Sequence, residues 1–183
     1  MNASLLSDRL WPQTGFARNA VLAVVGSLIV AAAAQVNVPM VPVPMTLQTL
    51  AVLMIGAAYG ARLGAATLAL YALEGAIGLP VFAGFKSGVM LASFGYVLGF
   101  IAAAYVVGFL AERGWDRSIP KMFAAMLLGA AVLYVPGLIW LSAWIGVDKA
   151  IQFGLVPFLV GDLVKAAVAA LGFPAAWALL GRR

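Results

Sequence analysis

Long apolar segments, separated by short polar or proline-rich stretches, make up most of this chain of 183 residues. The apolar segments are continuous and recur along the whole length. Continuous runs are typical of membrane helices, whereas the strands of a membrane β-barrel alternate between apolar and polar positions over about 10 residues. We therefore expect an all-α, polytopic membrane protein that forms a single integral membrane domain over residues 1–183.

The pattern predicts six transmembrane helices, over residues 17–36, 45–58, 63–77, 89–111, 122–145 and 157–180. The second and third are short, at roughly 21–23 Å for about 15 residues, against a hydrocarbon core of about 30 Å. This difference predicts a depression on one side of the bundle. Small residues at 31–34 before Gln35 also resemble a signal-peptide cleavage site, but the length of the first segment favours a retained helix.

Two loops are expected to cover the depression. Asn37–Pro44 contains three prolines within six residues, so it is predicted to be extended instead of helical. It is also almost wholly apolar, which favours packing against the helices at membrane depth. The glycine-containing loop Gly78–Gly88 lies on the same side of the predicted bundle.

The basic residues set the predicted orientation. Eight of them fall on the side of the two termini: Arg9, Arg18, Arg62, Arg113, Arg117, Lys121, Arg182 and Arg183. The opposite loops carry only Lys86 and Lys149. By the positive-inside rule both termini are cytoplasmic, and the protein is expected as a multi-pass protein of the bacterial cytoplasmic (inner) membrane.

Composition narrows the function. Charged residues make up 9% of the chain, whereas soluble domains carry about 25%. The net charge is +5, but the basic residues form no patch, so we expect no nucleic-acid partner. The chain has no Cys and no His, which removes thiol nucleophiles, the commonest metal ligand and the usual general base. We expect no enzyme, no metal and no cofactor. An intramembrane enzyme would need a paired-carboxylate site, and Glu74 with Asp162 is a poor candidate because Lys165 neighbours Asp162.

Asp162 and Lys165 place two opposite charges inside the apolar segment 158–171. At a spacing of three they share one face of a helix. A charged side chain in hydrocarbon costs about 2.5–3.5 kcal/mol on insertion scales, so this face is expected to point into the bundle. Two readings stay open: a structural ion pair between helices, and a polar ligand site inside the membrane. The rest of the chain favours the second.

Further polar residues are predicted in the same outer half of the bundle. Thr46 and Gln48 lie at the start of the second helix, Glu74 near the outer end of the third and Tyr96 in the fourth. Together with the charged pair they predict an outward-facing pocket for a small ligand with its own donors and acceptors.

Each of these residues has a second reading. Thr46 and Gln48 also suit a helix cap, Glu74 also suits an ion pair with Lys86, and Tyr96 also suits the aromatic belt at the membrane surface. The convergence of all of them favours the pocket.

Ala23, Ser27 and Ala31 follow one another at intervals of four on the first predicted helix. Small residues at this spacing let another helix approach closely. Packing within the bundle and docking of a second subunit are both open for this ridge.

Short motifs occur in a fixed order along the chain: Val43–Gln48, Gly60–Gly64, Tyr71 with Gly75, Gly78–Ala83, Gly95–Phe100 and Gly161–Lys165. In this order the chain resembles the BioY family of biotin transporters, which are substrate-capture components of energy-coupling factor (ECF) transporters. The resemblance extends from the first predicted helix to the sixth.

The resemblance implies a six-helix protein that binds biotin with high affinity from outside. It implies two kinds of partner, a transmembrane coupling subunit and cytoplasmic ATPase subunits, docked on small-residue helix faces, and the chain would contact membrane lipid throughout. Because some members of the family work without that module, a self-sufficient homo-oligomeric biotin transporter is the alternative.

The resemblance also implies a binding mode. Binding residues of the family correspond to Asp162 and Lys165, and further to Gln48 and Tyr96. Asp162 would accept an N–H of the ureido group and Lys165 would donate to its carbonyl, while the rings pack on Phe82 and Tyr96. The reverse arrangement, with Lys165 on the ligand carboxylate, stays open.

The chain departs from the family pattern at two places. Leu91–Tyr96 reads Leu-Ala-Ser-Phe-Gly-Tyr where the family usually has Gly-Pro-Thr-Gly-Gly-Tyr. Glu74 stands where family members are typically apolar. Both departures concern the floor of the predicted pocket.

Overall fold

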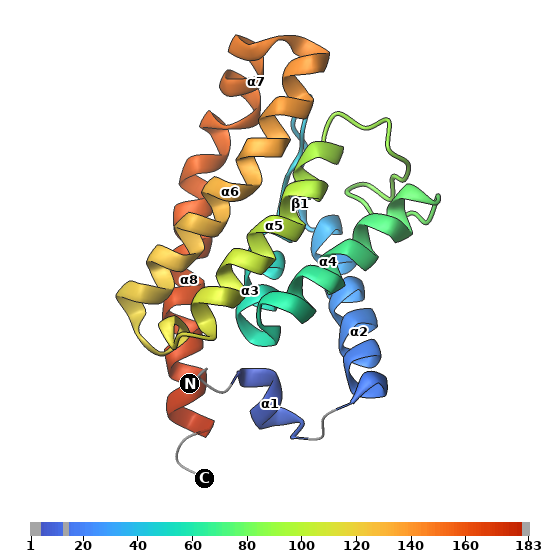
Figure 1. The fold of residues 1–183 in the computed structure, drawn as a ribbon. Helices are drawn as coiled ribbons and strands as arrows, with labels where there is room; N and C mark the ends of the chain where they lie inside the picture. Colours follow the sequence, from blue (N-terminus) through green and yellow to red (C-terminus); the bar gives the residue numbers. More distant parts are fainter. Residues whose placement is uncertain (1–4, 13–14, 181–183) are drawn as a thin grey trace.

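The computed structural model describes residues 5–12 and 15–180 of the chain, which form a bundle of α-helices (Figure 1). The elements in chain order are α1 (Leu6–Leu10), α2 (Phe16–Gln35), β1 (Asn37–Val38), β2 (Met45–Thr46), α3 (Gln48–Tyr59), α4 (Ala61–Ala76), α5 (Phe94–Ala111), the 3₁₀ helix η1 (Trp115–Arg117), α6 (Ile119–Ile145), α7 (Val147–Gly154) and α8 (Val156–Leu180). The predicted helical fold is therefore confirmed in its coarse form, since the described residues are mostly helical but also contain the short strands β1 and β2.

Four stretches of the described residues are long and apolar enough to cross a membrane: Phe16–Gln35, Phe94–Ala111, Ile119–Ile145 and Val147–Leu179, the last covering α7 and α8. With several such helices the chain is a multi-pass membrane protein. Helices α3 and α4 have 12 and 16 residues, so the expectation of two short helices is confirmed. That the chain crosses the membrane six times, and that both termini lie on the cytoplasmic side, are still predictions.

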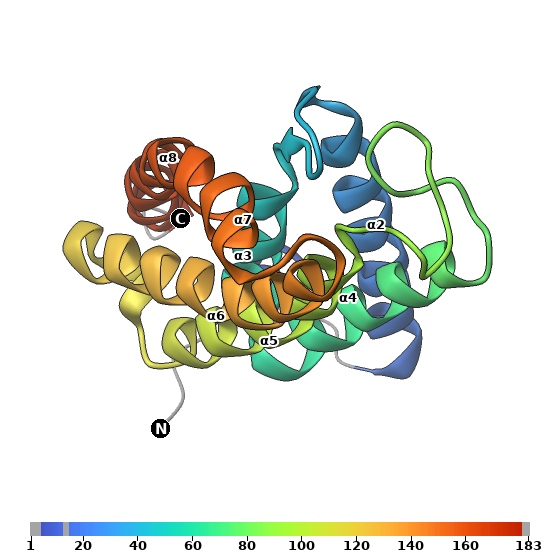
Figure 2. The same ribbon diagram turned by 90° about the horizontal axis from the view of Figure 1, so that it is seen from above.

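Helix α5 lies between α4 and α6 and packs against both of them and against α3 (Figure 2). Helix α2 packs mainly on α4, and α8 packs on α6 and α3. Gly108 allows α5 to approach the turn between α3 and α4, because a Cβ there would lie 2.4 Å from the backbone nitrogen of Ala61. Contacts this close between backbones are typical of membrane helices with small residues at the interface.

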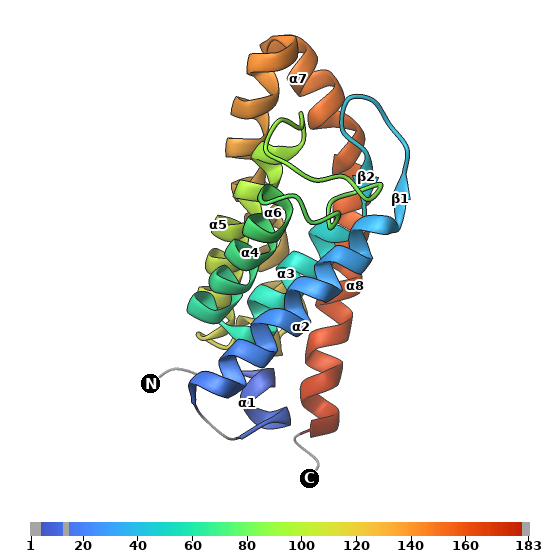
Figure 3. The same ribbon diagram turned by 90° about the vertical axis from the view of Figure 1, so that its right-hand side faces the viewer.

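The two ends of the bundle differ. One end carries α1 and the end of α8, and the other carries the β1–β2 hairpin, the loop of residues 77–93 and α7 (Figures 1 and 3). The hairpin pairs Asn37 with Thr46 and Val38 with Met45, so the proline-rich segment between them forms the loop that connects two short strands.

Three boundaries differ from the sequence prediction. The helix expected from residue 89 begins at Phe94, because residues 89–93 continue the preceding loop. Residues 147–154, expected as a loop, form α7, which starts directly after Gly146. The polar N-terminal stretch contains α1, where Asp8 forms an ion pair with Arg18 at 3.0 Å. Charged residues at both places favour a loop in the sequence, but in the structure they lie on the exposed sides of short helices.

The 3₁₀ helix η1 connects the α5–α6 turn to α8. Asp116 is fully buried there and accepts a hydrogen bond from the indole N–H of Trp177, while the guanidinium of Arg117 lies 4.5 Å from the centre of the same indole ring. Burial raises the pKa of the Asp116 carboxyl, and the Trp177 N–H and the Arg117 charge oppose this shift in part. The fold thus holds a carboxyl in a position where its charged form is less favourable than in water.

Candidate functional site

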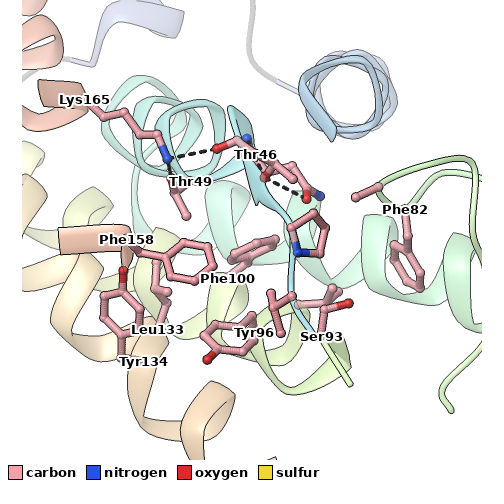
Figure 4. Close-up of a pocket in the computed structure, with 15 residues that line it drawn as sticks. Thr46, Thr49, Phe82, Ser93, Tyr96, Phe100, Leu133, Tyr134, Phe158 and Lys165 are labelled. Atoms are coloured by element: carbon pink, nitrogen blue, oxygen red, sulfur yellow. Dashed lines mark hydrogen bonds between the residues drawn. The ribbon is translucent and has the colours of Figure 1, made fainter. Parts of the chain in front are cut away.

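A cavity lies beneath the β1–β2 hairpin, among α3, α5, α6 and α8 (Figure 4). The side chains that line it combine polar groups with aromatic rings: Val43, Pro44, Thr46, Gln48, Thr49, Phe82, Ala83, Ser93, Tyr96, Val97, Phe100, Leu133, Tyr134, Phe158 and Lys165. A mostly apolar pocket with a few convergent polar groups is the usual form of a small-molecule site.

Lys165 is the cationic group of the cavity. Its Nζ donates to Thr49 Oγ1 at 2.7 Å, to the backbone oxygen of Thr46 at 2.9 Å and to Asp162 Oδ1 at 3.3 Å. Its side chain is 14% exposed. The three N–H donors of an ammonium group are therefore all directed at acceptors, which suits a charge held away from water.

Asp162 lies behind Lys165, outside the cavity lining. Its carboxylate accepts hydrogen bonds from the hydroxyl of Tyr134, from Thr49 Oγ1 at 3.3 Å and from Lys165. The two interpretations of the pair, a structural ion pair and a ligand site, are therefore compatible with one arrangement. Asp162 and Lys165 form an ion pair within α8, and Lys165 also lines the cavity together with Tyr134 and Thr49.

Thr46 and Gln48 line the cavity from β2 and the start of α3. Thr46 Oγ1 accepts a hydrogen bond from the backbone N–H of Gln48 at 3.2 Å. It therefore also pairs one of the N–H groups that have no partner within the helix at the start of α3. Gln48 Nε2 donates to the hydroxyl of Tyr71 at 2.6 Å, and that hydroxyl donates to the backbone oxygen of Val81 at 3.0 Å. This chain of hydrogen bonds connects the cavity wall to the loop of residues 77–93.

Aromatic rings form the apolar part of the wall. Tyr96 lines the cavity from α5, and its hydroxyl donates to the backbone oxygen of Gly154 at 2.9 Å. Phe82 is 3% exposed and packs edge-to-face on Tyr71, with ring centres 5.5 Å apart. Gly75 makes room for this ring, since a Cβ at that position would lie 2.0 Å from Phe82 Cζ.

Glu74 was predicted in the pocket, and the structure places it elsewhere. Its carboxylate accepts a hydrogen bond from Ser27 Oγ at 3.0 Å, so it faces α2 and does not line the cavity. Its expected partner Lys86 is exposed on the loop, and no ion pair joins these two described residues. Ser27 in turn is fully buried, so it packs within the chain instead of presenting a docking face; Ala23 and Ala31 are half-buried.

Sequence reasoning missed three polar residues of the cavity, Thr49, Ser93 and Tyr134. Thr49 lies one residue after Gln48, so the polar spacing at the start of α3 contained a signal for it. Tyr134 is a single hydroxyl within the apolar stretch before Pro136, and only the structure shows that it meets Asp162. The other predicted residues of the cavity, Thr46, Gln48 and Tyr96 among them, lie together as described above.

Comparison with known sequences adds to this geometry. The model of the BioY family matches residues 2–182, nearly the whole chain. The chain belongs to the BioY family. Among its relatives, the biotin transporter BioY of Thermotoga maritima is 37% identical over 158 residues, which cover 84% of this chain and 92% of the relative. The biotin transporter BioY of Rhizobium etli is 38% identical over 148 residues, covering 74% and 79% of the two chains.

A solved structure shares the fold of this BioY-family chain. It is described as the crystal structure of the S-component for biotin from an ECF-type ABC transporter. The two chains superpose with a TM-score of 0.73 at 22% identity, over 87% of this chain and 90% of the other. The arrangement of helices around the cavity is therefore that of a known transporter component.

Proposed function

We propose that this chain binds biotin in the cavity around Lys165 and mediates its uptake as the substrate-specific component of an ECF-type transporter. The observation that carries the proposal is the ammonium of Lys165, held by Asp162 and two threonines at the wall of an aromatic cavity in a chain of the BioY family. The relatives named as biotin transporters support biotin as the ligand.

The polar cluster suits the ureido group of biotin, which has one carbonyl acceptor and two N–H donors. Lys165 donates to the carbonyl, in exchange for its longest contact, the 3.3 Å bond to Asp162. Thr46, Gln48 and Tyr134 line the same cavity, and their side-chain oxygens are the proposed acceptors for the ureido N–H groups. Asp162 then acts as the neighbouring counter-charge of Lys165 and holds Tyr134 through its hydrogen bond. Charge-assisted hydrogen bonds of this kind contribute about 1.5–3 kcal/mol each.

The apolar part of biotin suits the rest of the wall. The fused rings and the valeryl chain pack on Phe82, Tyr96, Phe100 and Phe158, which line the cavity from α5, α8 and the loop of residues 77–93. The ligand carboxylate lies towards the mouth, where the exposed Lys86 is its proposed partner.

Partners follow from the same proposal. A coupling subunit and ATPase subunits drive release into the cytoplasm, and the fold shared with a biotin S-component supports this assignment. Helix α2 presents exposed apolar side chains, among them Val25, Leu28 and Ile29, which suit membrane lipid or a helix of the coupling subunit. The chain is placed in the bacterial cytoplasmic membrane with both termini inside.

Titration of the purified protein with biotin, desthiobiotin and thiamine tests the proposal. We expect saturable, tight binding of biotin, weaker binding of desthiobiotin, which keeps the ureido group, and no binding of thiamine. Folded protein that does not bind biotin would overturn the proposal. Uptake by cells with and without the coupling and ATPase subunits then separates the ECF component from a self-sufficient transporter.

A further inference from the structure

The loop of residues 77–93 forms one side of the cavity through Phe82 and Ala83. Its backbone is tied to the helices towards both ends, by Gly88 N–H to the backbone oxygen of Gly75 at 2.7 Å and by the indole N–H of Trp140 to the backbone oxygen of Leu91 at 2.9 Å. The space inside the cavity is small, since the centre of a water molecule has only about 50 Å³ to move through. Entry of a ligand the size of biotin therefore requires part of the wall to move.

Gln35, the last residue of α2, ties this loop to the bundle. Its Nε2 donates to the backbone oxygen of Phe82 at 3.1 Å, and its Oε1 accepts from the backbone N–H of Phe85 at 3.2 Å. One amide side chain thus forms hydrogen bonds with two backbone groups of the same loop, the oxygen of Phe82 and the N–H of Phe85. It reaches them from a helix that is 47 and 50 residues away along the chain.

Phe85 makes this connection unusual. Its φ of +56° lies in the left-handed region, which a residue with a Cβ seldom adopts. Its side chain is 71% exposed, so packing of the ring does not hold the backbone in that conformation. Strained residues of this kind persist where neighbouring groups fix them, and the acceptor of Gln35 is such a group.

Gln35 does not line the cavity, so it acts on the ligand only through Phe82. We infer that Gln35 is a positioning residue that sets how fast biotin enters and leaves, by holding the loop of residues 77–93 closed over the cavity. The inference rests on the proposed biotin binding. Because the bonds of Gln35 involve protein groups alone, their loss lowers the barrier to loop opening for entry and exit alike.

Kinetics of radiolabelled biotin on Gln35→Leu test the inference. We expect the association and dissociation rate constants both to rise about ten-fold, and their ratio, Kd, to stay within about three-fold of wild type. A ten-fold change equals about 1.4 kcal/mol, within the range of two net hydrogen bonds. Gln152→Leu is the matched control, since Gln152 is exposed on α7 away from the loop, and it should leave both rates unchanged.

Each other outcome overturns the inference. A rise in dissociation alone would mean that Gln35 stabilises the bound complex instead of the closed loop. A lower melting temperature with unchanged rates would mean a purely structural role. Wild-type protein that binds no biotin would overturn the proposed function itself, which separates the two failures.

A covalent latch gives a second test in the opposite direction. The chain has no cysteine, so the double variant Gln35→Cys with Phe85→Cys offers a single pair for a short, reducible thiol cross-linker. We expect cross-linking to slow both entry and exit of biotin by at least ten-fold, and reduction to restore fast exchange. Exchange that is unaffected by the cross-link would contradict the inference even if Gln35→Leu did not fold.

Discussion

Asp162 and Lys165 show how two charges are kept inside a membrane bundle. Each is costly alone, but the carboxylate accepts from Tyr134, Thr49 and Lys165, and the ammonium donates to three oxygens. The sequence made the pair visible because charges are rare in apolar segments. Thr49 follows Gln48 and so continues a polar signal in the sequence, but Tyr134 could not be found, since a single hydroxyl in an apolar helix has no pattern that identifies its partner.

Asp162→Asn tests this network. The amide keeps the shape of the side chain but loses the charge that holds Lys165, so biotin affinity should fall about 10- to 100-fold, or about 1.5–3 kcal/mol. Lys149→Ala, at an exposed position on α7, is the control and should bind as wild type. Titration calorimetry measures both, and equal affinities of the two variants would contradict the role of Asp162.

Tyr134→Phe removes one hydroxyl and keeps the ring in the wall. Because that hydroxyl donates to Asp162, we expect a loss of about ten-fold in biotin affinity. Tyr105→Phe provides the comparison, since Tyr105 lies exposed on α5, stacked on Phe109. A Tyr134→Phe variant with wild-type affinity would show that the hydroxyl has no part in holding the site.

At the scale of elements, the apolar pattern predicted the helices well and the connections poorly. Hydrophobicity alone extended the fourth predicted helix back to residue 89, but it does not show that the loop of residues 77–93 folds back on α4. The charges after Gly146 suggested a loop, although they lie on the outer side of α7. Glu74 was misplaced because the side of α4 that it occupies depends on the packing of α2.

Gly75→Ala tests the contact between α4 and the loop. A methyl group there overlaps the ring of Phe82, so the loop must shift away from the cavity wall. We expect biotin affinity to fall at least ten-fold, and a melting temperature measured beside it shows whether the variant is folded. Gly172→Ala, in α8 with no atom near its added Cβ, controls for a glycine change in a helix. An unchanged affinity for Gly75→Ala would contradict the placement of Phe82.

Asp116→Asn tests the joint between η1 and α8. The raised pKa means that folded protein keeps this proton to higher pH than unfolded protein, so stability falls as pH rises through the raised pKa. At neutral pH the variant, which carries no charge, should melt about 2–4 °C higher, or about 1 kcal/mol. Its advantage over wild type should shrink towards acid pH. An Asp116→Asn variant that is less stable than wild type at pH 8 would contradict this. So would the same gain in melting temperature from Asp148→Asn, the control at an exposed position on α7.

The whole molecule is expected to present the cavity to the outside and both termini to the cytoplasm. Because the chain has no cysteine, Lys149→Cys and Lys121→Cys each introduce a single thiol, both at exposed positions. In intact cells a membrane-impermeant thiol reagent should label Lys149→Cys, and it should label Lys121→Cys only after permeabilisation. The reverse pattern would invert the predicted topology, and with it the direction from which ligand is captured.

Biotin binding at the cavity is the central claim, and calorimetric titration of wild-type protein beside Lys165→Ala tests it most directly. The wild type should bind one biotin tightly, and Lys165→Ala should bind it at least 100-fold more weakly. The variant loses the charged donor of the cavity, and Asp162 loses its ion-pair partner. Melting temperatures of both proteins confirm that each is folded. Equal biotin affinity of folded wild type and folded Lys165→Ala would contradict the account.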